Sequence, residues 1–463
     1  MVCIELGRHC VQLGQESIII GNMTPKTLRP ASWASQIDRG LIIAGSILIL
    51  VACGARSNLD NLSASVGGAN SVGGVTAGGG AQSTGGLISA VGTGGLKATG
   101  GSANTGGTAA IGGSITNLAV GHSHTCALIK GGVQCWGSNW SGELGNNSID
   151  QSPALVPVQV QGLTSGVMAI TAGGAHTCAL VNGGAQWWGD SGFVLLDVNY
   201  LIQSRVPVQV LGLTSGVTAI AAGARHTCAI VNGGAQCWGN NSSGQLGNNS
   251  IDDSPDPVHV QGLTSGVTAL AANEWNSCAV VNGGVQCWGV NFYGKVGNGP
   301  SIYSLVPIQI QGLTSGATAI AVGAAHACAL VDGGAQCWGY NNLGQLGNNS
   351  TTDSAIPVQV QGLTSGVTAI SAGGGNTCAL VNGGVQCWGN NSNGQLGNGS
   401  TTDSLVPVQV QGLTSGVTAI AGGGLHTCAW VNSGVQCWGL NGYGQLGNNS
   451  TVDSPVPVQV LFP

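Results

Sequence analysis

Cysteine and histidine are the residue types of this chain that could form a chemical site, because both recur at regular intervals. Cysteines come in pairs nine positions apart, which suits either a cross-strand disulfide or half of a metal site. A histidine precedes most of the pairs, and a ring of imidazoles could bind metal or move protons. These histidines are His124, His176, His226, His326 and His426.

The histidines are predicted to be structural. In two repeats Asn276 and Asn376 take their place, and asparagine cannot replace a metal-binding or proton-shuttling imidazole. One tryptophan per repeat is likewise interpreted as packing between repeats, and one aspartate per loop as a turn residue instead of a calcium ligand. The repeats do not bring a nucleophile, a base and an orienting group together in one motif. We therefore expect that the protein has no enzymatic activity and binds neither a metal nor a cofactor. The tryptophans are Trp136, Trp188, Trp238, Trp288, Trp338, Trp388 and Trp438, and the aspartates Asp253, Asp353, Asp403 and Asp453.

Charge is scarce. Of the 463 residues only 6% are charged, 83 are glycine, and the formal net charge is −6, whereas soluble domains are typically about 25% charged. From residue 114 onward the cations are Lys130, Arg205, Arg225 and Lys295. A nucleic-acid binder needs several cations on one face, so we expect no nucleic-acid partner.

Residues 1–53 are predicted to be an export signal. An apolar run over residues 41–52 follows three basic residues and is too short to span a bilayer. Its end, Leu-Val-Ala-Cys-Gly, resembles the lipobox of bacterial lipoproteins, which implies that Cys53 carries a lipid anchor. The alternatives are a plain secretory signal or a poorly inserting membrane anchor, and Met23 is a possible true start. Residues 54–113, rich in Gly, Ser, Thr and Ala, are predicted to be a disordered linker.

Residues 114–463 are predicted to form an all-β, seven-bladed propeller of four-stranded antiparallel blades. A unit marked by Cys-Trp-Gly, or Trp-Trp-Gly in the second copy, recurs seven times, with spacings of 52 once and 50 thereafter. The third unit contains four β-rich runs, at 207–211, 217–221, 226–231 and 235–239. Because the first unit lacks a leading PVQV run and the chain ends on one, strand 456–460 is predicted to close the ring by joining the first blade, residues 114–140.

The repeated pattern G-x-x-H-T-C-A-L-x-x-x-G-G-x-Q-C-W-G-x-N-x-x-G-Q-L-G-N resembles the regulator of chromosome condensation repeat family. The resemblance implies a seven-bladed propeller. It also implies an alternative function, guanine-nucleotide exchange, for which the family uses a protruding β-hairpin. The loops here are expected to be short. A further alternative is inhibition of an extracellular enzyme, as some secreted bacterial relatives inhibit β-lactamases.

The cysteine pairs are predicted to be disulfides. An Asn232-Gly233 type I′ turn places Cys228 directly opposite Cys237, within bridging distance. A zinc site would need a further pair. Disulfides require an oxidising compartment, in agreement with the export signal. Cys178 faces Trp187 and should be a free thiol. The predicted bridges are Cys126–Cys135, Cys228–Cys237, Cys278–Cys287, Cys328–Cys337, Cys378–Cys387 and Cys428–Cys437.

Departures from the repeat concentrate in the second to fourth units. Strand parity puts them on one face, and aromatic residues with arginine are typical of binding hot spots. We therefore predict a protein-binding patch there, with neutral drift of loops as the alternative. Its residues are Phe193, Leu195, Leu196, Tyr200, Arg225, Trp275, Phe292, Tyr293 and Lys295.

Together these patterns predict an exported, lipid-anchored propeller that binds a protein partner at the cell envelope, on the outer surface or in the periplasm. A secreted protein is the alternative. We expect a monomer that meets the membrane only through its anchor.

Overall fold

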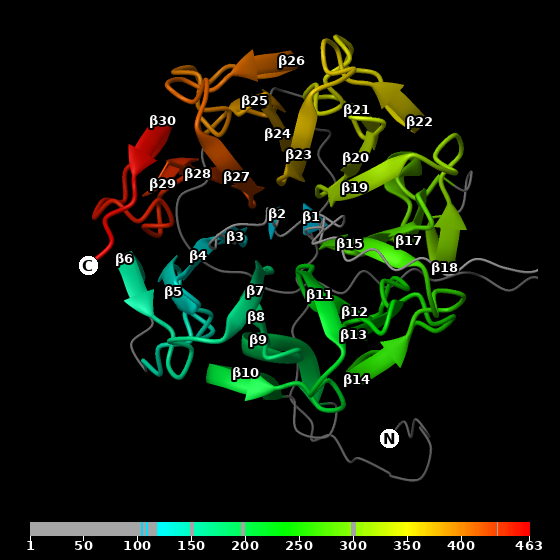
Figure 1. The fold of residues 1–463 in the computed structure, drawn as a ribbon, viewed down its shortest axis with the longest axis vertical. Helices are drawn as coiled ribbons and strands as arrows, with labels where there is room; N and C mark the ends of the chain where they lie inside the picture. The colour runs from blue at the N-terminus through cyan, green and yellow to red at the C-terminus, as the bar shows by residue number, and fades with distance from the viewer. Residues whose placement is uncertain are drawn as a thin grey trace, which may run out of the picture. The chain divides into compact units, whose positions relative to one another are not determined.

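The chain folds into seven four-stranded antiparallel sheets around a central axis (Figure 1). The computed structural model describes residues 103–104, 108–109, 118–148, 152–195, 200–297, 302–432 and 434–463. The predicted all-β propeller is thus confirmed. The predicted signal over residues 1–53, with Cys53, and nearly all of the predicted linker lie outside the described residues. Within the described ranges no helix is long and apolar enough to cross a membrane.

The blades share one strand order, from the axis outward. Blade 1 comprises β3 (Leu118–Val120), β4 (His124–Ile129), β5 (Gly132–Gly137) and β6 (Ala154–Gln159). Blade 2 comprises β7 (Val167–Ala172), β8 (His176–Val181), β9 (Gly184–Leu195) and β10 (Tyr200–Gln209). Blade 3 comprises β11 (Val217–Ala222), β12 (His226–Val231), β13 (Gly234–Gly239) and β14 (Ser254–His259). Blade 4 comprises β15 (Val267–Asn273), β16 (Asn276–Val281), β17 (Gly284–Val290) and β18 (Tyr303–Gln309), with a 3-10 turn η1 (Phe292–Gly294).

Blades 5 to 7 repeat this order without insertions. Blade 5 comprises β19 (Ala317–Val322), β20 (His326–Val331), β21 (Gly334–Gly339) and β22 (Ser354–Gln359). Blade 6 comprises β23 (Val367–Ala372), β24 (Asn376–Val381), β25 (Gly384–Gly389) and β26 (Ser404–Gln409). Blade 7 comprises β27 (Val417–Gly422), β28 (His426–Val431), β29 (Gly434–Gly439) and β30 (Ser454–Gln459).

The two middle strands of each blade form a hairpin whose turn has the predicted conformation. In blade 3 Asn232 has φ 51° and Gly233 φ 81°, the left-handed pair that a type I′ turn requires. This turn sets the register in which Cys228 pairs with Cys237, with Cα atoms 4.0 Å apart. All six predicted disulfides form, and Cys178 is a buried free thiol.

The PVQV run is the outermost strand of the preceding blade and not the first strand of the next. In blade 3 the outer strand β14 pairs with β13, across the long loop between them. Its proline explains the position, since proline lacks the N–H that an interior strand must donate and is confined to sheet edges. The inner strand β11 (VTAIAA) instead carries small side chains, which fit the crowded region near the axis.

The predicted ring closure was therefore wrong. Strand β30 pairs with β29 of its own blade, and the first blade is completed by its own β6. The ring closes by packing of blade 7 against blade 1, where Trp136 and Val120 share a buried cluster with the Cys428–Cys437 disulfide. A strand shared between the ends is not needed, because each blade already contains its fourth strand.

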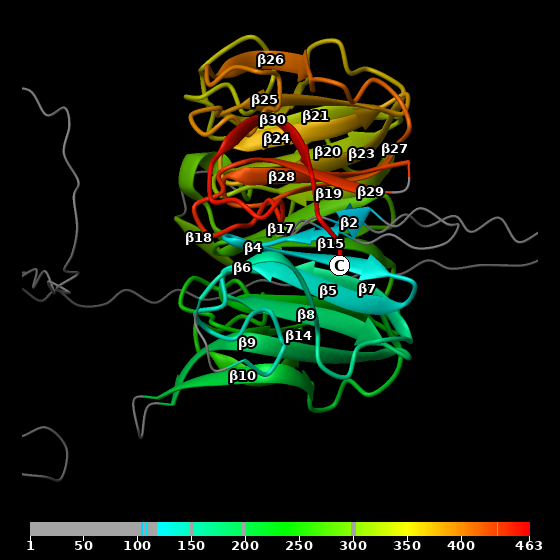
Figure 2. The same cartoon turned by 90° about the vertical axis from the view of Figure 1, so that its left-hand side faces the viewer.

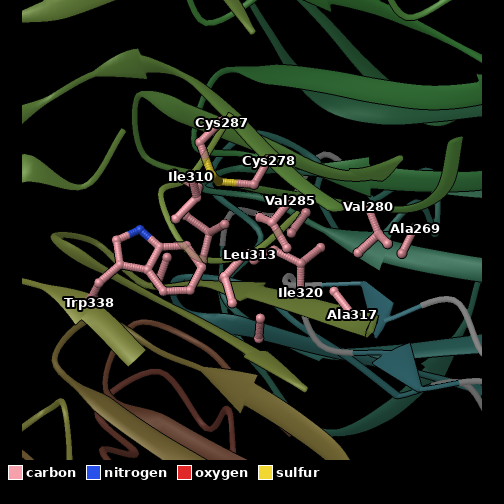
Figure 3. Close-up of a cluster of buried hydrophobic side chains, with 14 of the residues drawn as sticks. Ala269, Cys278, Val280, Val285, Cys287, Ile310, Leu313, Ala317, Ile320 and Trp338 are labelled. Atoms are coloured by element: carbon pink, nitrogen blue, oxygen red, sulfur yellow. A yellow bond between two sulfur atoms is a disulfide. The ribbon is translucent and has the colours of Figure 1, made fainter. Parts of the chain in front are cut away.

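The hydrophobic core lies between neighbouring blades, in one cluster per interface. Between blades 4 and 5, Trp338 lies in the same cluster as the Cys278–Cys287 disulfide, Ile310 and Leu313 (Figure 3). Each disulfide is thus also part of the apolar packing that joins one blade to the next.

Two segments differ from the sequence predictions. Within the predicted linker, β1 (Ala103–Asn104) and β2 (Thr108–Ala109) pair antiparallel and contact the inner strands β15, β19, β23 and β27 near the axis (Figure 1). In blade 2 the expected short loop is replaced by an extension of β9 and β10, which remain paired as far as Leu195 and Tyr200. Extending the strands pairs the backbone of a segment that lacks the Gly-x-x-Gly-Asn sequence of the other loops.

Candidate functional site

One face of the ring carries the segments that vary. In blade 3 the corner 223–225 joins β11 to β12, and the long loop 240–253 joins β13 to β14. Because successive strands are antiparallel, corners and long loops share one face, which we call the corner–loop face, while the Asn-Gly and GLTSG turns lie on the other. The side view in Figure 2 shows the blades between these two faces.

Three of the predicted patch residues gather on this face at the junction of blades 4 and 5. Trp275 is 48% exposed, Phe292 54% and Tyr293 51%. They line a groove of about 260 Å³, which we call the aromatic groove. The Tyr293 ring lies 4.4 Å from that of Tyr340, centroid to centroid, in the blade 5 loop. Exposed aromatic side chains around a concavity are the composition of a protein-binding hot spot.

Lys295, predicted as a patch residue, lines the aromatic groove but does not project from this face as the loop position predicted. Only 2% of the residue is exposed. Its Nζ donates to the main-chain carbonyl of Gly323 at 2.6 Å and to that of Ala324 at 3.0 Å. Burial lowers the pKa of the Lys295 amine to about 7, partly opposed by Glu274. The lysine thus forms the base of the aromatic groove and joins blade 4 to the corner of blade 5.

The other predicted patch residues do not line the aromatic groove. Arg225 is exposed on the corner of blade 3. Phe193, Leu195 and Tyr200 belong to the β9–β10 hairpin of blade 2, where the structure describes only the backbone, and Leu196 lies outside the described residues. The predicted patch is therefore not one continuous surface. Part of it forms the aromatic groove, and the remaining described residues lie on the corner of blade 3 and the hairpin of blade 2.

The histidines connect neighbouring blades through hydrogen bonds. His326 Nε2 lies 2.8 Å from the hydroxyl of Thr377, and His426 Nε2 lies 2.8 Å from that of Thr125. Burial lowers the pKa of His326 and of His426 to about 3, so both imidazoles are neutral at physiological pH. In blade 6, Asn376 donates to Thr427 in the same way at 3.4 Å. These contacts agree with the structural role predicted from the Asn substitutions.

The loop aspartates are turn residues, as predicted. The Asp253 carboxylate accepts the main-chain N–H of Asn241 at 2.7 Å, and Asp453 accepts that of Asn441 at 2.7 Å. Among the described residues no three histidine, cysteine or acidic side chains come together in a way that could hold a metal ion.

The corners also surround a cavity of about 320 Å³ on the axis. Its described lining is mostly glycine and alanine, with His122 and Glu274 as the ionisable side chains. Glu274 adopts a left-handed φ of 31°, and its N–H donates to the Asn273 side chain at 2.7 Å. The cavity therefore presents main chain more than chemically reactive groups.

The predictions from sequence did not include a hydrogen bond that joins neighbouring blades. It connects the GQLGN-type segment of one blade to the tryptophan of the next, two motifs that recur at a fixed spacing in the repeat. The Trp288 indole donates to the Gln245 carbonyl of the preceding blade at 2.8 Å, and Ser277 donates to the same oxygen at 3.0 Å. Six tryptophans are held in this way: Trp136, Trp188, Trp288, Trp338, Trp388 and Trp438. We call this contact the tryptophan latch. The recurrence of both motifs at one spacing was the signal that could have revealed it.

The fold and its variable face define a closed seven-bladed β-propeller in which six blades carry a cross-strand disulfide. Family models for the regulator of chromosome condensation (RCC1) repeat match residues 130–180, 232–280, 282–330, 332–380, 382–430 and 434–463, and a second model of the same repeat matches 217–245 and 367–395. The chain belongs to the RCC1 repeat family.

Solved structures agree on the fold. Human WBSCR16 is 23% identical, with a TM-score of 0.62, over 71% of this chain and 94% of that one. Yeast RCC1 (Prp20), solved bound to Kap60, is 20% identical with a TM-score of 0.62, over 75% and 84% of the two chains. A second structure, of Prp20p from Saccharomyces cerevisiae, is 22% identical with a TM-score of 0.57, over 66% and 80%. No curated protein sequence matches the chain.

Proposed function

We propose that this protein is an exported propeller without enzymatic activity, which binds a protein partner at the aromatic groove. The observation that carries the proposal is the exposure of Trp275, Phe292 and Tyr293 around one concavity. Large aromatic side chains give contact area at low cost in conformational entropy, which is why they dominate binding hot spots.

The groove rests on a rigid base, which favours binding. Lys295 ties the blade 4 loop to the carbonyls of Gly323 and Ala324, and its own carbonyl accepts the Trp338 indole at 2.8 Å. A loop fixed in this way loses little freedom when a partner docks.

The six disulfides indicate an oxidising, extracytoplasmic environment. We propose that the chain is exported to the cell envelope and anchored there through an acylated Cys53, with secretion as the alternative. Growth with a palmitate analogue followed by fractionation tests the anchor. Label lost in a Cys53→Ala variant supports it, and an unlabelled wild-type protein contradicts it.

Guanine-nucleotide exchange is a second candidate, favoured by one observation. The β9–β10 hairpin of blade 2 extends beyond the other loops, as an exchange hairpin would need. One solved relative, Prp20p, was described with its binding to Gsp1p and histones. Exchange on a small GTPase would require a reducing compartment, in which six disulfides would not persist.

A paired-variant experiment tests binding at the aromatic groove. The variant Trp275→Ala with Phe292→Ala removes two groove aromatics. The control, Trp140→Ala with Tyr443→Ala, removes two exposed aromatics from the long loops of blades 1 and 7, at positions equivalent to Phe292 and Tyr293. Partners captured from an envelope extract by the wild type and the control should be recovered at least tenfold less by the groove variant. Equal recovery by all three proteins would refute the groove as the binding surface.

A further inference from the structure

The junction of blades 2 and 3 is where the tryptophan latch is missing. At the other six junctions a long loop supplies a main-chain carbonyl to the next blade's tryptophan. Blade 2 has no GQLGN segment, because β9 and β10 replace its loop. Trp238, the tryptophan of blade 3, consequently has an indole N–H without a hydrogen-bond partner among the described residues.

A second donor lacks the same acceptor. At the next junction the Ser277 hydroxyl contacts His226 Nε2 at 2.8 Å and Cys228 Sγ at 3.6 Å, and still donates to the Gln245 carbonyl. Thr227 makes the equivalent contacts, with His176 Nε2 at 3.0 Å and Cys178 Sγ at 3.7 Å, but it donates to no loop carbonyl of the described residues. Two hydrogen-bond donors thus converge on the place that a carbonyl oxygen occupies elsewhere.

In the described part of the chain, an apolar side chain is missing at this junction as well. The loops of the other blades bury a leucine or valine against the next blade, as Leu246 does beside Trp288. Among the residues that the structure describes, the blade 2–3 cluster contains no leucine or valine from a long loop, and Trp187, at the position of the second cysteine, packs against the cluster while partly buried. A pocket of about 170 Å³ remains, lined by Trp187, Trp238 and Thr227. Since a water molecule takes about 30 Å³, the pocket has room for several ligand atoms.

The charge around the pocket selects among possible acceptors. Asp190 and Asp256 both line it. A carboxylate or phosphate brought to Trp238 would meet these two acidic side chains, whereas a neutral amide carbonyl would not be repelled. The pocket therefore fits a main-chain carbonyl better than an anion.

We propose that this junction pocket binds an extended peptide segment of a partner protein. A main-chain carbonyl of the segment accepts from Trp238 and Thr227, and a neighbouring leucine-like side chain fills the apolar space. The six complete junctions support this occupant, because the chain's own loops, Gly-Gln-Leu-Gly at four of them and Gly-Glu-Leu-Gly and Gly-Lys-Val-Gly at the other two, each place a main-chain carbonyl on the tryptophan and bury a leucine or valine. The pocket is separate from the aromatic groove, and the proposal does not depend on the function proposed for that groove.

The experiment uses the loop of blade 3 as the probe, in the form of an acetylated and amidated peptide with the sequence of residues 241–250 (NSSGQLGNNS). The ¹⁵N-labelled propeller is titrated with it, and the indole signals are followed by NMR. The Trp238 signal is assigned by its loss in Trp238→Phe, a variant that keeps an aromatic ring. The matched control is Trp288→Phe, whose indole N–H is already bonded to Gln245.

Two results are expected. Without peptide, the Trp238 indole hydrogen exchanges with water at least tenfold faster than the six latched indoles, because it lacks their buried acceptor. The peptide shifts the Trp238 signal saturably, and Trp238→Phe weakens binding about tenfold while Trp288→Phe leaves it unchanged.

Three outcomes would overturn the proposal. They are a Trp238 indole as protected as the latched ones in the free protein, no saturable shift with the peptide, or equal affinity for wild type and Trp238→Phe. A peptide carrying aspartate in place of the leucine should bind at least tenfold more weakly, and equal binding of this peptide would also contradict the proposed occupant.

Discussion

Trp136 in blade 1 donates its indole N–H to the main-chain carbonyl of Gln445 in blade 7, over 2.9 Å in space and 309 positions in sequence. The same oxygen accepts the Thr125 hydroxyl at 3.0 Å. The ring is thus closed by the latch that also joins its interior blades, and none of the described strands is shared between the first and last blades.

This latch should contribute to stability. We expect Trp136→Phe to lower the free energy of unfolding by about 1–1.5 kcal/mol, because a buried hydrogen bond is lost. Adding Thr125→Val leaves the Gln445 carbonyl without either donor and His426 Nε2 without its hydroxyl partner, and should bring the total loss to about 3 kcal/mol. Urea unfolding followed by fluorescence measures both values.

The chain provides a matched control for the latch. Trp238→Phe makes the same chemical change at the junction that lacks the latch. It should therefore lower the free energy of unfolding by less than Trp136→Phe does. If Trp136→Phe and Trp238→Phe destabilised the protein equally, the stabilising effect would belong to ring packing and not to the hydrogen bond.

Blade 2 should accept a seventh disulfide. Trp187 lies directly opposite Cys178 in the register that the other blades use for their bridges. We expect Trp187→Cys to form a bridge with Cys178, seen as a loss of two mass units and of the thiol in non-reducing peptide mapping.

In the wild type this thiol should be inert, because burial raises the pKa of Cys178 to about 12. Trp187→Ala serves as the control, and its Cys178 thiol should react with alkylating agents only after unfolding. An unbridged Trp187→Cys protein would show that the hairpin of blade 2 does not reach disulfide geometry.

Acid should destabilise the ring through its histidines. The pKa of His326 is lowered from an ordinary 6.5 to about 3 by burial, so the unfolded chain binds a proton between these values and the folded one does not. The contribution of the neutral histidine to the free energy of unfolding is therefore fully present above pH 6.5. It falls as the pH drops towards 3, by about 1.4 kcal/mol per pH unit for each such histidine.

His326→Asn should remove one histidine's share of this slope, because Asn376 already makes the equivalent contact in blade 6. Urea midpoints between pH 7 and pH 4.5 measure the slope. His259→Asn, at an exposed position, is the control and should leave the slope unchanged. An equal effect of both variants would contradict the assignment to the buried ring.

Lys295 should make stability depend on alkaline pH. Its pKa is lowered from 10.5 to about 7 by burial. The contribution of the neutral amine to the free energy of unfolding is therefore fully present above pH 10.5 and is lost as the pH falls to 7. Lys295→Gln restores the residue that most repeats have and does not titrate. The stability advantage of Lys295→Gln over wild type should therefore grow by about 1.4 kcal/mol per unit as the pH falls from 9 towards 7. Lys130→Gln, at an exposed site, should show no such trend, and a pH-independent difference for Lys295→Gln would refute the assignment.

The sequence alone determined everything that depends on local pattern. The recurrence of Cys-Trp-Gly predicted the number of blades, and the Asn-Gly dipeptide predicted the turn that brings Cys228 opposite Cys237. Strand parity predicted which connections share a face, since antiparallel neighbours alternate direction in any strand assignment.

Only the tertiary structure decided where a blade begins, how the ring closes and which side chains are buried. A circular repeat looks the same from any starting strand, so its period cannot show whether PVQV begins or ends a unit, although its proline indicated an edge. The latch between Trp136 and Gln445 and the burial of Lys295 arise where one blade's loop meets the next blade. Such contacts depend on packing between distant segments, which local periodicity does not encode.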